Sequence, residues 1–580
     1  MMDLALTLRD GLLDITPKMP PSLPEEILVL ILEHLAFPDV RIFGDISDED
    51  TETSDPDGLQ FEEYLEDVRD GITALQHACL ASKSLHRLAW PILYRALTSR
   101  EPFDASVTPS NFLRTVCLKP EYGLALRSLS IGDWNPIEAM DALDLFTLLQ
   151  GDATVVALFQ WRAKGFWFGD ELLLGDDISL DAMDTAIGTL CRALNMGLLD
   201  GHMTLLLLMC PNIQDLDILP ALDFGTTTFA KLLNIAISPS FQSKSLPDPL
   251  PDPEEEESDY IVSQMFGASW PQRKIQKPKV LQHLKTLKIR SPGPTGLCLD
   301  FYMNLMSLPS LQCLSLHSLW GGPTEVLDSD VQCTQLRTLE LPNCHLPSDE
   351  LAAILKFCPG LTKLVVVWDN LPDLGSPRGP HCLEYGYIGN SIKVHTPLLE
   401  TLTLDSAEGW VNDGDDSKRV SFLGSSLTDL THLRRLTIDD HSVYGSLNGE
   451  IGFTLADTIP KSVIWLELRL EETLEPHISE DYQYQNNDVI GFLQDESFSR
   501  LCRVDLVMWK RLKLRDLRVR ALKDHGWSVA THTMKGQGYD SRGEILINQA
   551  RLKAMEADDV WSWQRFCRNS FAPSLRATKR

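Results

Sequence analysis

The sequence has few basic residues and none of the common catalytic motifs. Lys and Arg number 52 against 82 Asp and Glu, which leaves a formal net charge of −30. A nucleic-acid surface needs clustered Lys and Arg to displace counterions from phosphates, so this composition argues against one. The chain also has no G-x-x-x-x-G-K-[ST], H-E-x-x-H or G-x-S-x-G motif. We therefore expect no enzyme active site, no cofactor and no metal.

Paired cysteines, long apolar runs and N-glycosylation acceptors are missing as well. The 12 cysteines are scattered, and the closest two in sequence, Cys333 and Cys344, make no C-x-x-C spacing. The longest aliphatic run, Met203–Cys210, is far shorter than the ~20 residues that span a bilayer. The first 20 residues carry acids among short apolar stretches, unlike a signal peptide. These absences predict a cytosolic or nuclear protein with buried, reduced thiols and no membrane segment.

What the chain does contain, from Leu126 onward, is a repeated L-x-x-L-x-L motif. The chain of 580 residues is longer than one compact core normally supports, so we expect either several domains or one elongated repeat domain. The motif occurs ten times, with the first, second and third aliphatic residue at Leu126/Leu129/Ile131, Ile213/Leu216/Ile218, Leu284/Leu287/Ile289, Leu311/Leu314/Leu316, Leu336/Leu339/Leu341, Leu361/Leu364/Val366, Leu399/Leu402/Leu404, Leu433/Leu436/Ile438, Val463/Leu466/Leu468 and Leu501/Val504/Leu506. Three successive intervals of 27, 25 and 25 residues fall in the range of leucine-rich repeats.

One repeat unit matches the complete leucine-rich-repeat motif. Residues 336–346, LRTLELPNCHL, match L-x-x-L-x-L-x-x-C-x-L at every fixed position. Ser348 to Glu350 then mark a helix start, and Cys358-Pro359 its end. Neither the strand nor the helix of such a unit can bury its apolar face alone, so neighbours must stack. The sequence predicts an α/β fold, an irregular leucine-rich-repeat solenoid with a curved parallel sheet.

The alternate strand positions are candidates for a binding surface. Side chains alternate between the two faces of a strand, so the residues between the aliphatics point to the concave face. They include Thr286, Lys288 and Arg290; Thr338 and Glu340; Lys363, Val365 and Val367; Thr401, Thr403 and Asp405; Arg435, Thr437 and Asp439; Trp465, Glu467 and Arg469; Arg503 and Asp505. Aromatic and Arg side chains are enriched at interaction centres. We select Arg435, Trp465, Glu467, Arg469 and Arg503 as the candidate target-binding residues, with ordinary solvated strand positions as the alternative.

The N-terminal region carries a second, helical pattern. In Leu23–Leu35, LPEEILVLILEHL, the aliphatics recur at helical spacing behind Pro24 and two glutamates, which suit a first helical turn. Two more short helical patterns lie in Ala74–Leu97. The helical segments amount to about 43 residues, close to the ~40-residue limit below which a chain seldom builds a sufficient core. They carry more aliphatic surface than so short a chain can bury by itself. The segment therefore predicts a docking partner.

These residues resemble a known family. Leu23-Pro24, Glu26-Ile27-Leu28, Ile31 and Leu35, followed by Ser82-Lys83, Leu85 and Arg87-Leu88-Ala89, are similar to the F-box, although Ala81 and Leu85 stand where the family usually has Val and often has Trp. The F-box is the three-helix module by which substrate receptors dock on the Skp adaptor of cullin ubiquitin ligases. The resemblance implies adaptor binding through Leu23, Pro24, Ile27, Ile31, Leu85 and Leu88.

Together these patterns predict four regions. They are an N-terminal tail (1–20), an F-box-like module (21–98) with an acidic insert (41–72), a solenoid (99–530) with an acidic, Pro-rich loop (242–259), and a C-terminal helix and tail (531–580). Within them we expect a helix in Thr204–Cys210, polar excursions at Gly409–Lys418 and Glu475–Asp488, a closing helix over Leu514–Lys523, a closing strand over Gly526–Val529, a turn at Lys535–Gly538 and a helix over Ile545–Trp563.

The first functional hypothesis is the non-catalytic substrate-recognition subunit of a Skp/cullin/F-box ubiquitin ligase. Its partners would be the Skp adaptor, a cullin through that adaptor, and an unknown target protein. The alternative is a repeat scaffold for protein interactions without a ligase role, whose N-terminal helices only cap the first repeat.

Overall fold

The computed structural model describes the chain in segments. These are residues 24–36, 72–99, 111–133, 190, 193–194, 199–219, 281–290, 297–298, 305–306, 308–320, 333–368, 383–406, 423–439, 442–443, 454–470, 479–508, 522, 524–536, 539–548 and 550–551. They divide into two compact units at Arg95 and Ala96. We call them the helical unit and the sheet unit.

The helical unit contains helix α2 (Glu25–Ala36), a helix over residues 72–81, and α4 (Lys83–Leu93). The Pro24 carbonyl accepts hydrogen bonds from the first turn of α2, and the Ser82 hydroxyl caps α4 by accepting from Leu85 N at 3.1 Å. The three predicted helical patterns are therefore confirmed. The helical segment ends earlier than Leu97, however, because Ala96–Ser99 forms a strand that the sequence pattern did not indicate.

The sheet unit is built on a 13-stranded sheet. Its strands are β1 (Ala96–Ser99), β2 (Ser128–Asp133), β3 (Asp215–Leu219), β4 (Thr286–Ile289), β6 (Cys313–Leu316), β8 (Thr338–Cys344), β9 (Lys363–Trp368), β10 (Thr401–Asp405), β11 (Arg435–Asp439), β12 (Trp465–Leu470), β13 (Arg503–Met508), β14 (Trp527–Gly536) and β15 (Tyr539–Asn548). They lie in chain order except that β15 comes between β13 and β14. The prediction of an α/β chain with a parallel sheet is confirmed, since every pairing up to β13 is parallel.

The ten motifs occupy ten consecutive strands in one register. Their second aliphatic residues pair across the sheet from Leu129 and Leu216 through to Leu466 and Val504. Just before each strand, one carbonyl accepts two N–H groups of the next strand, as Arg434 O does from Ile464 N (2.8 Å) and Trp465 N (3.1 Å). The aliphatic motif positions are buried almost completely. Regular pairing and burial of one face explain why this register is stable.

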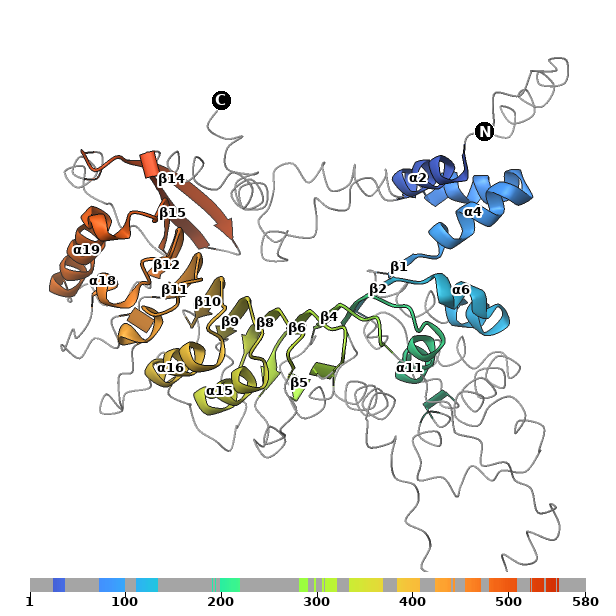
Figure 1. Ribbon diagram of the computed structural model, residues 1–580, viewed down its shortest axis with the longest axis horizontal. Coiled ribbons are helices and arrows are strands. Elements are labelled where there is room, and N and C mark those ends of the chain that lie inside the picture. The colour runs from blue at the N-terminus through green and yellow to red at the C-terminus, as the bar shows by residue number, and fades with distance from the viewer. Residues whose placement is uncertain are drawn as a thin grey trace, which may run out of the picture. The chain divides into compact units, whose positions relative to one another are not determined.

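Helices cover the buried face of the sheet. They are a helix over residues 111–118, α6 (Pro120–Ala125), α11 (Leu199–Met209), α15 (Ser348–Phe357), α16 (Tyr385–His395), α18 (Leu455–Thr458), α19 (Ser479–Gln494) and the 3-10 helices η7 (Gly424–Leu427) and η8 (Glu496–Phe498). A second, two-stranded sheet pairs β5 (Leu297–Cys298) with β7 (Leu319–Trp320). In Figure 1 the strands of the main sheet follow an arc, and α15, α16 and α19 lie on its outer side. The helix predicted in Thr204–Cys210 and the one starting at Ser348 are both confirmed.

A hairpin closes the C-terminal end of the sheet. Strand β15 pairs antiparallel with both β13 and β14, and Trp527 of β14 is buried with its Nε1 donating to Leu493 O at 3.0 Å. The predicted closing strand is confirmed from Trp527 onward. Of the predicted turn, Lys535 and Gly536 belong to β14, and Gln537 and Gly538 lie outside the described residues. The predicted helix over Ile545–Trp563 is wrong at its start, because Ile545 to Asn548 belong to β15. The short apolar run Ile545-Leu546-Ile547, with two β-branched residues, suits a strand at least as well as a helix.

A second correction concerns Glu475–Asp488, predicted as a polar excursion. Helix α19 begins at Ser479 and continues to Gln494. Its first ten residues are polar, but Val489, Phe492 and Leu493 are buried and hold its end against the sheet unit. The predicted excursion at 409–418, the Pro-rich loop at 242–259 and the acidic insert, except for Ile72, lie outside the described residues, as does most of Leu514–Lys523.

Candidate interaction surfaces

The helical unit exposes one face of α2. Leu32 is buried in a small core with Leu75, Ala89 and Ile92, against which Val29 also packs. On the other side of the helix, Ile27 is 41%, Leu30 59% and Ile31 45% exposed. Leu80, at the end of the helix over residues 72–81, is 84% exposed. An aliphatic stripe at this spacing normally faces a core, so its exposure leaves apolar surface for another molecule.

Ion pairs and the small core hold the helices of this unit together. Arg87 on α4 pairs with Glu25, and Arg95 pairs with Glu33 at 2.8 Å. Each is well exposed, so each contributes at most about 1 kcal/mol. The orientation of α4 against α2 therefore depends mainly on the buried aliphatics.

The structure places the predicted adaptor-binding residues in three environments. Pro24, Ile27 and Ile31 are exposed at the start of α2 and along it. Leu85 and Leu88 of α4 are half-buried, and Leu88 packs against the unit's own core. Leu23 lies outside the described residues. Exposed Leu30 and Leu80 were not selected from the sequence, although their place in the apolar pattern could have indicated them.

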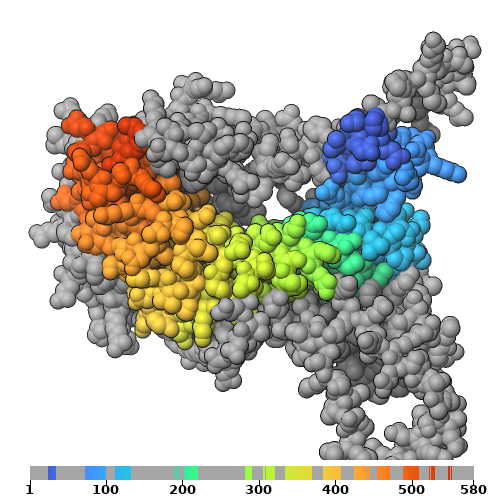
Figure 2. Space-filling view, in the orientation of Figure 1, coloured from blue at the N-terminus to red at the C-terminus, as the bar shows by residue number. Residues whose placement is uncertain are grey.

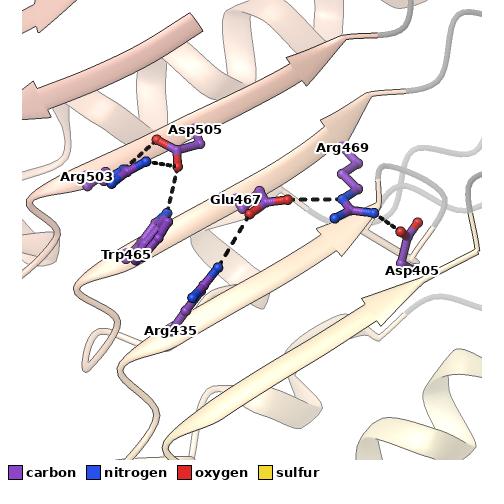
Figure 3. A network of polar contacts seen from close by, with 7 residues as sticks. All are labelled: Asp405, Arg435, Trp465, Glu467, Arg469, Arg503 and Asp505. Atoms are coloured by element: carbon purple, nitrogen blue, oxygen red, sulfur yellow. Dashed lines mark hydrogen bonds and ion pairs between the residues drawn. The ribbon is translucent and has the colours of Figure 1, made fainter. Parts of the chain in front are cut away.

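A second candidate surface is a polar cluster on strands β10 to β13 of the sheet unit. In Figure 2 the described residues of this unit form a continuous band in chain order, with these strands in its yellow to orange part. The sheet register sets Arg435 beside Trp465, and Trp465 beside Arg503. Figure 3 shows these three residues with Glu467, Arg469, Asp405 and Asp505 in one network. All five predicted target-binding residues thus belong to a single cluster.

Trp465 lies at the centre of this cluster, between two guanidinium groups. The Arg435 Cζ is 3.8 Å and the Arg503 Cζ 4.1 Å from the centre of the indole ring. The indole Nε1 donates to Asp505 Oδ2 at 2.9 Å. These contacts leave Trp465 only 6% exposed. Cation–π stacking on a largely desolvated ring contributes about 1–2 kcal/mol per guanidinium, so the chain's own arginines hold this ring in place.

Carboxylates neutralise two of the three arginines closely. Asp505 accepts from Arg503 Nε at 2.8 Å and Nη2 at 2.7 Å, a two-point contact. Arg469 donates from Nε to Glu467 Oε1 at 3.0 Å and also pairs with Asp405. Burial raises the pKa of the Asp505 carboxyl, against the lowering effect of Arg503. Asp405 and Asp505 were among the alternate strand positions but were not selected. Asp505 follows Arg503 by two residues on β13, whereas only the arrangement of the strands brings Asp405 of β10 to Arg469 of β12.

Arg435 is neutralised less closely. Its Nη2 is 3.9 Å from Glu467 Oε2, which is an ion pair but not a hydrogen bond. Within the described residues its Nε is buried without a hydrogen-bond partner. Burial lowers the pKa of the Arg435 guanidinium, against the raising effect of Glu467. An arginine remains charged under these conditions, so Arg435 is a cation with unused donors.

Buried polar groups fix the strand ends beside this cluster. Asp439, at the end of β11, accepts from Ser406 N at 2.7 Å and from Ser442 N at 2.7 Å. The Ser406 hydroxyl also donates to it at 2.8 Å, and the Tyr385 hydroxyl of α16 at 3.4 Å. Burial, with the nearby Asp439 charge, raises the pKa of Tyr385 well above its usual value. This network ties α16 to the ends of β10 and β11.

Other possible sites give weaker signals. Among the residues that the structure describes, no three His, Cys, Asp or Glu side chains gather as a metal site would require, and no helix has the length and apolar character to cross a membrane. None of the cysteines whose side chains the structure describes forms a disulfide; Cys79 and Cys313 are half-buried, and Cys117, Cys210, Cys333, Cys344, Cys358 and Cys502 are buried. No protein-family model matches the chain, and the search of curated proteins also found no match.

Proposed function

We propose that this chain is the substrate-recognition subunit of a Skp/cullin/F-box ubiquitin ligase. The helical unit would be an F-box-like module that docks the Skp adaptor. The sheet unit would be an irregular leucine-rich-repeat solenoid that holds a target protein. The chain would act without catalysis of its own, in the cytoplasm or nucleus, while other subunits transfer ubiquitin.

The observation that supports adaptor docking, the first half of this proposal, is the exposure of Ile27 and Ile31 on α2. Both belong to the segment that resembles the F-box, and both remain more than 40% exposed although their helix packs on a core. Fully burying an Ile side chain stabilises a complex by roughly 1.5–3 kcal/mol, so these two residues with Leu30 supply an apolar anchor. The salt bridges of this unit lie at its surface.

Support for the target-binding half comes from the sheet. Ten strands of one motif, in one register, bury their aliphatic side chains on the helix side, so the alternate side chains face the other way except at strand ends such as Asp439. Stacked repeats of this kind produce extended surfaces that proteins use for binding. The cluster around Trp465 is rich in Arg and aromatic side chains, the composition of interaction centres.

Copurification of the adaptor tests the docking half. The intact protein should retain the Skp adaptor, whereas Pro24→Ala combined with Ile27→Asp should lose it, because a carboxylate cannot be buried in an apolar contact. Gln76→Asp is the matched control, since Gln76 is exposed on the same unit and outside the predicted contact. Equal adaptor retention by all three proteins, or none by the intact protein, would contradict the proposal.

Deletion of residues 1–95 separates the proposal from a scaffold without a ligase role. A docking module should be dispensable for the sheet, so the truncated chain should unfold cooperatively with a nearly unchanged midpoint. A helical cap that shields the first repeat should be needed for folding, and its removal should lower the midpoint sharply. Circular dichroism during thermal unfolding distinguishes the two outcomes.

A further inference from the structure

The cluster on β10 to β13 has one cation whose hydrogen-bonding capacity is largely unused. Arg469 and Arg503 each make two contacts with carboxylate oxygens at hydrogen-bond range. Arg435 makes only the 3.9 Å ion pair, and its Nε has no partner among the described residues. That Nε is buried and out of reach of a ligand, but the side chain is 36% exposed, and within the described residues its Nη atoms make no hydrogen bond to a carboxylate. Of the three arginines in this cluster, Arg435 is the one without a carboxylate at hydrogen-bond distance among the described residues.

The neighbouring strands supply a place for an acceptor. The register puts Thr401 of β10 beside Arg435 on one side and beside Lys363 of β9 on the other. The side chains of Arg435 and Lys363 are 36% and 43% exposed. Two strand spacings separate them by about 10 Å, with the shorter Thr401 side chain between them. A group placed above Thr401 would lie between two cations.

The side chains of Lys363, Thr401 and Arg435 favour a carboxylate as the bound acceptor. A guanidinium is planar and presents paired donors that match the two oxygens of a carboxylate. Arg435 is also held in orientation by its stacking on Trp465, so binding would cost little side-chain entropy. Lys363 is already paired with Glu340 at 2.8 Å and would add positive potential more than a direct contact.

We propose that Lys363, Thr401 and Arg435 form a subsite for an Asp or Glu side chain of the bound target segment. The carboxylate accepts hydrogen bonds from the Nη atoms of Arg435, on the side of the guanidinium that is not stacked on Trp465. This inference rests on the target-binding half of the proposed function and is independent of adaptor docking.

Peptide mixtures provide the probe. Immobilised nonapeptides, random except for a fixed central residue, are incubated with the full-length protein, and retention is compared for central Asp, Glu, Asn, Gln and phosphoserine. We expect Asp and Glu mixtures to retain about tenfold more protein than Asn and Gln mixtures, the scale of a charge-assisted hydrogen bond. Arg435→Gln should reduce this ratio to near one. Arg114→Gln, at an exposed position of the helix over residues 111–118, should leave it unchanged.

A second variant protects the test against a folding defect in Arg435→Gln. Thr401→Glu places the chain's own carboxylate beside Arg435, so it should abolish the preference while the guanidinium and its stacking remain. Thermal unfolding of each variant within a few degrees of wild type would show that the sheet is intact.

Several results would overturn the subsite. They are equal retention of Asp, Glu, Asn and Gln mixtures, a preference that survives both Arg435→Gln and Thr401→Glu, no retention of any mixture, or a tenfold preference for phosphoserine over Asp and Glu. Adaptor copurification with Arg435→Gln should match wild type, since that residue is not in the helical unit. Its outcome tests the ligase role separately.

Discussion

At the scale of single residues, the charged groups near the strand ends differ in how well their neighbours satisfy them. Asp439 accepts three hydrogen bonds of 2.7–2.8 Å and is completely buried. Asp429, by contrast, is 64% exposed in its side chain and pairs with Lys393 at the surface. We therefore expect Asp439 to stabilise the fold. The Asp429–Lys393 pair lies at the surface and should contribute little to the free energy of unfolding.

Asp439→Asn should destabilise the sheet unit by about 2–3 kcal/mol. The substituted amide must turn one N–H donor toward the Ser406 or Ser442 amide, which leaves a buried donor unsatisfied. Urea unfolding followed by circular dichroism gives the free energy of unfolding. Asp429→Asn is the control and should change it by less than about 1 kcal/mol. Similar values for the two variants would show that the Asp439 network does not stabilise the fold.

His202 makes a pH-dependent contribution that opposes folding in acid. It is 3% exposed in α11, and burial lowers its pKa from the ordinary 6.5 to about 4. Between these values the unfolded chain binds the proton and the folded chain does not, so stability rises with pH. Lowering the pH from 7.5 to 5 should therefore cost about 2 kcal/mol through this group alone.

The measurement is the loss of unfolding free energy between pH 7.5 and pH 5. In His202→Gln the loss should be smaller than in wild type by that amount. His432→Gln, at an exposed position, should lose as much as wild type. A pH dependence of His202→Gln identical to wild type would contradict the assignment.

At the scale of elements, close approach between helices is decided by single glycines. A Cβ on Gly123 of α6 would lie 2.5 Å from Met209 O of α11 and 2.8 Å from a Val116 methyl carbon. A Cβ on Gly491 of α19 would meet nothing within 4 Å. The two positions share a residue type and a helical setting but differ in what lies beside them.

Gly123→Ala should destabilise the protein by about 1–3 kcal/mol, because a backbone oxygen cannot move aside without shifting α11. Gly491→Ala should stabilise it by about 0.5–1 kcal/mol, since alanine loses less backbone entropy in a helix. Thermal unfolding of both variants beside wild type gives the sign. Equal shifts in the same direction would mean that helix propensity alone governs both sites.

Ser348 illustrates another element-level effect. The sequence predicts it as the start of α15, and the helix does begin there. Its hydroxyl does not cap that helix, however; it accepts from Glu384 N at 2.8 Å, at the start of α16. The local pattern indicated the helix boundary, but only the packing of α15 beside α16 decided where the side chain bonds.

At the scale of the whole sheet unit, stability depends on stacking and on a closed end. Each strand is paired with the next through β13, whose outer edge is then covered by β15. Arg551 adds to this closure by donating to Phe498 O at 2.7 Å and Leu501 O at 3.3 Å. An uncovered β13 would present a row of unpaired backbone groups.

Deletion of residues 524–580 should therefore make the protein aggregate. Removal of β14 and β15 exposes the edge of β13 and the apolar site of Trp527, and open edges promote pairing between molecules. Light scattering at a fixed protein concentration measures the effect. Deletion of 552–580 is the control, because it keeps the hairpin and Arg551, and it should leave the light scattering equal to that of the intact protein. Aggregation of both truncations to the same degree would assign the effect to the tail.

Much of the fold could be predicted because the aliphatic repeat is local. Burial of one face requires the same spacing in each strand, so the ten motifs, the helix at Ser348 and the helical segments of the N-terminal region could be recognised one at a time. The errors came where a local pattern was ambiguous. Strand β1 is too short to show periodicity, Ile545 suits a strand or a helix, and the polar start of α19 resembles a loop.

The candidate site shows the same division. Periodicity alone determined that Arg435, Trp465 and Arg503 share one face of the sheet, since side chains alternate along a strand. The sequence could not show that Trp465 is stacked between the two arginines, that Asp505 accepts a hydrogen bond from its indole, or that Arg435 keeps unused donors. Those properties depend on pairing between strands some 30 to 40 residues apart in the chain. They were decided only by the tertiary structure, because register and side-chain packing depend on all neighbouring strands at once.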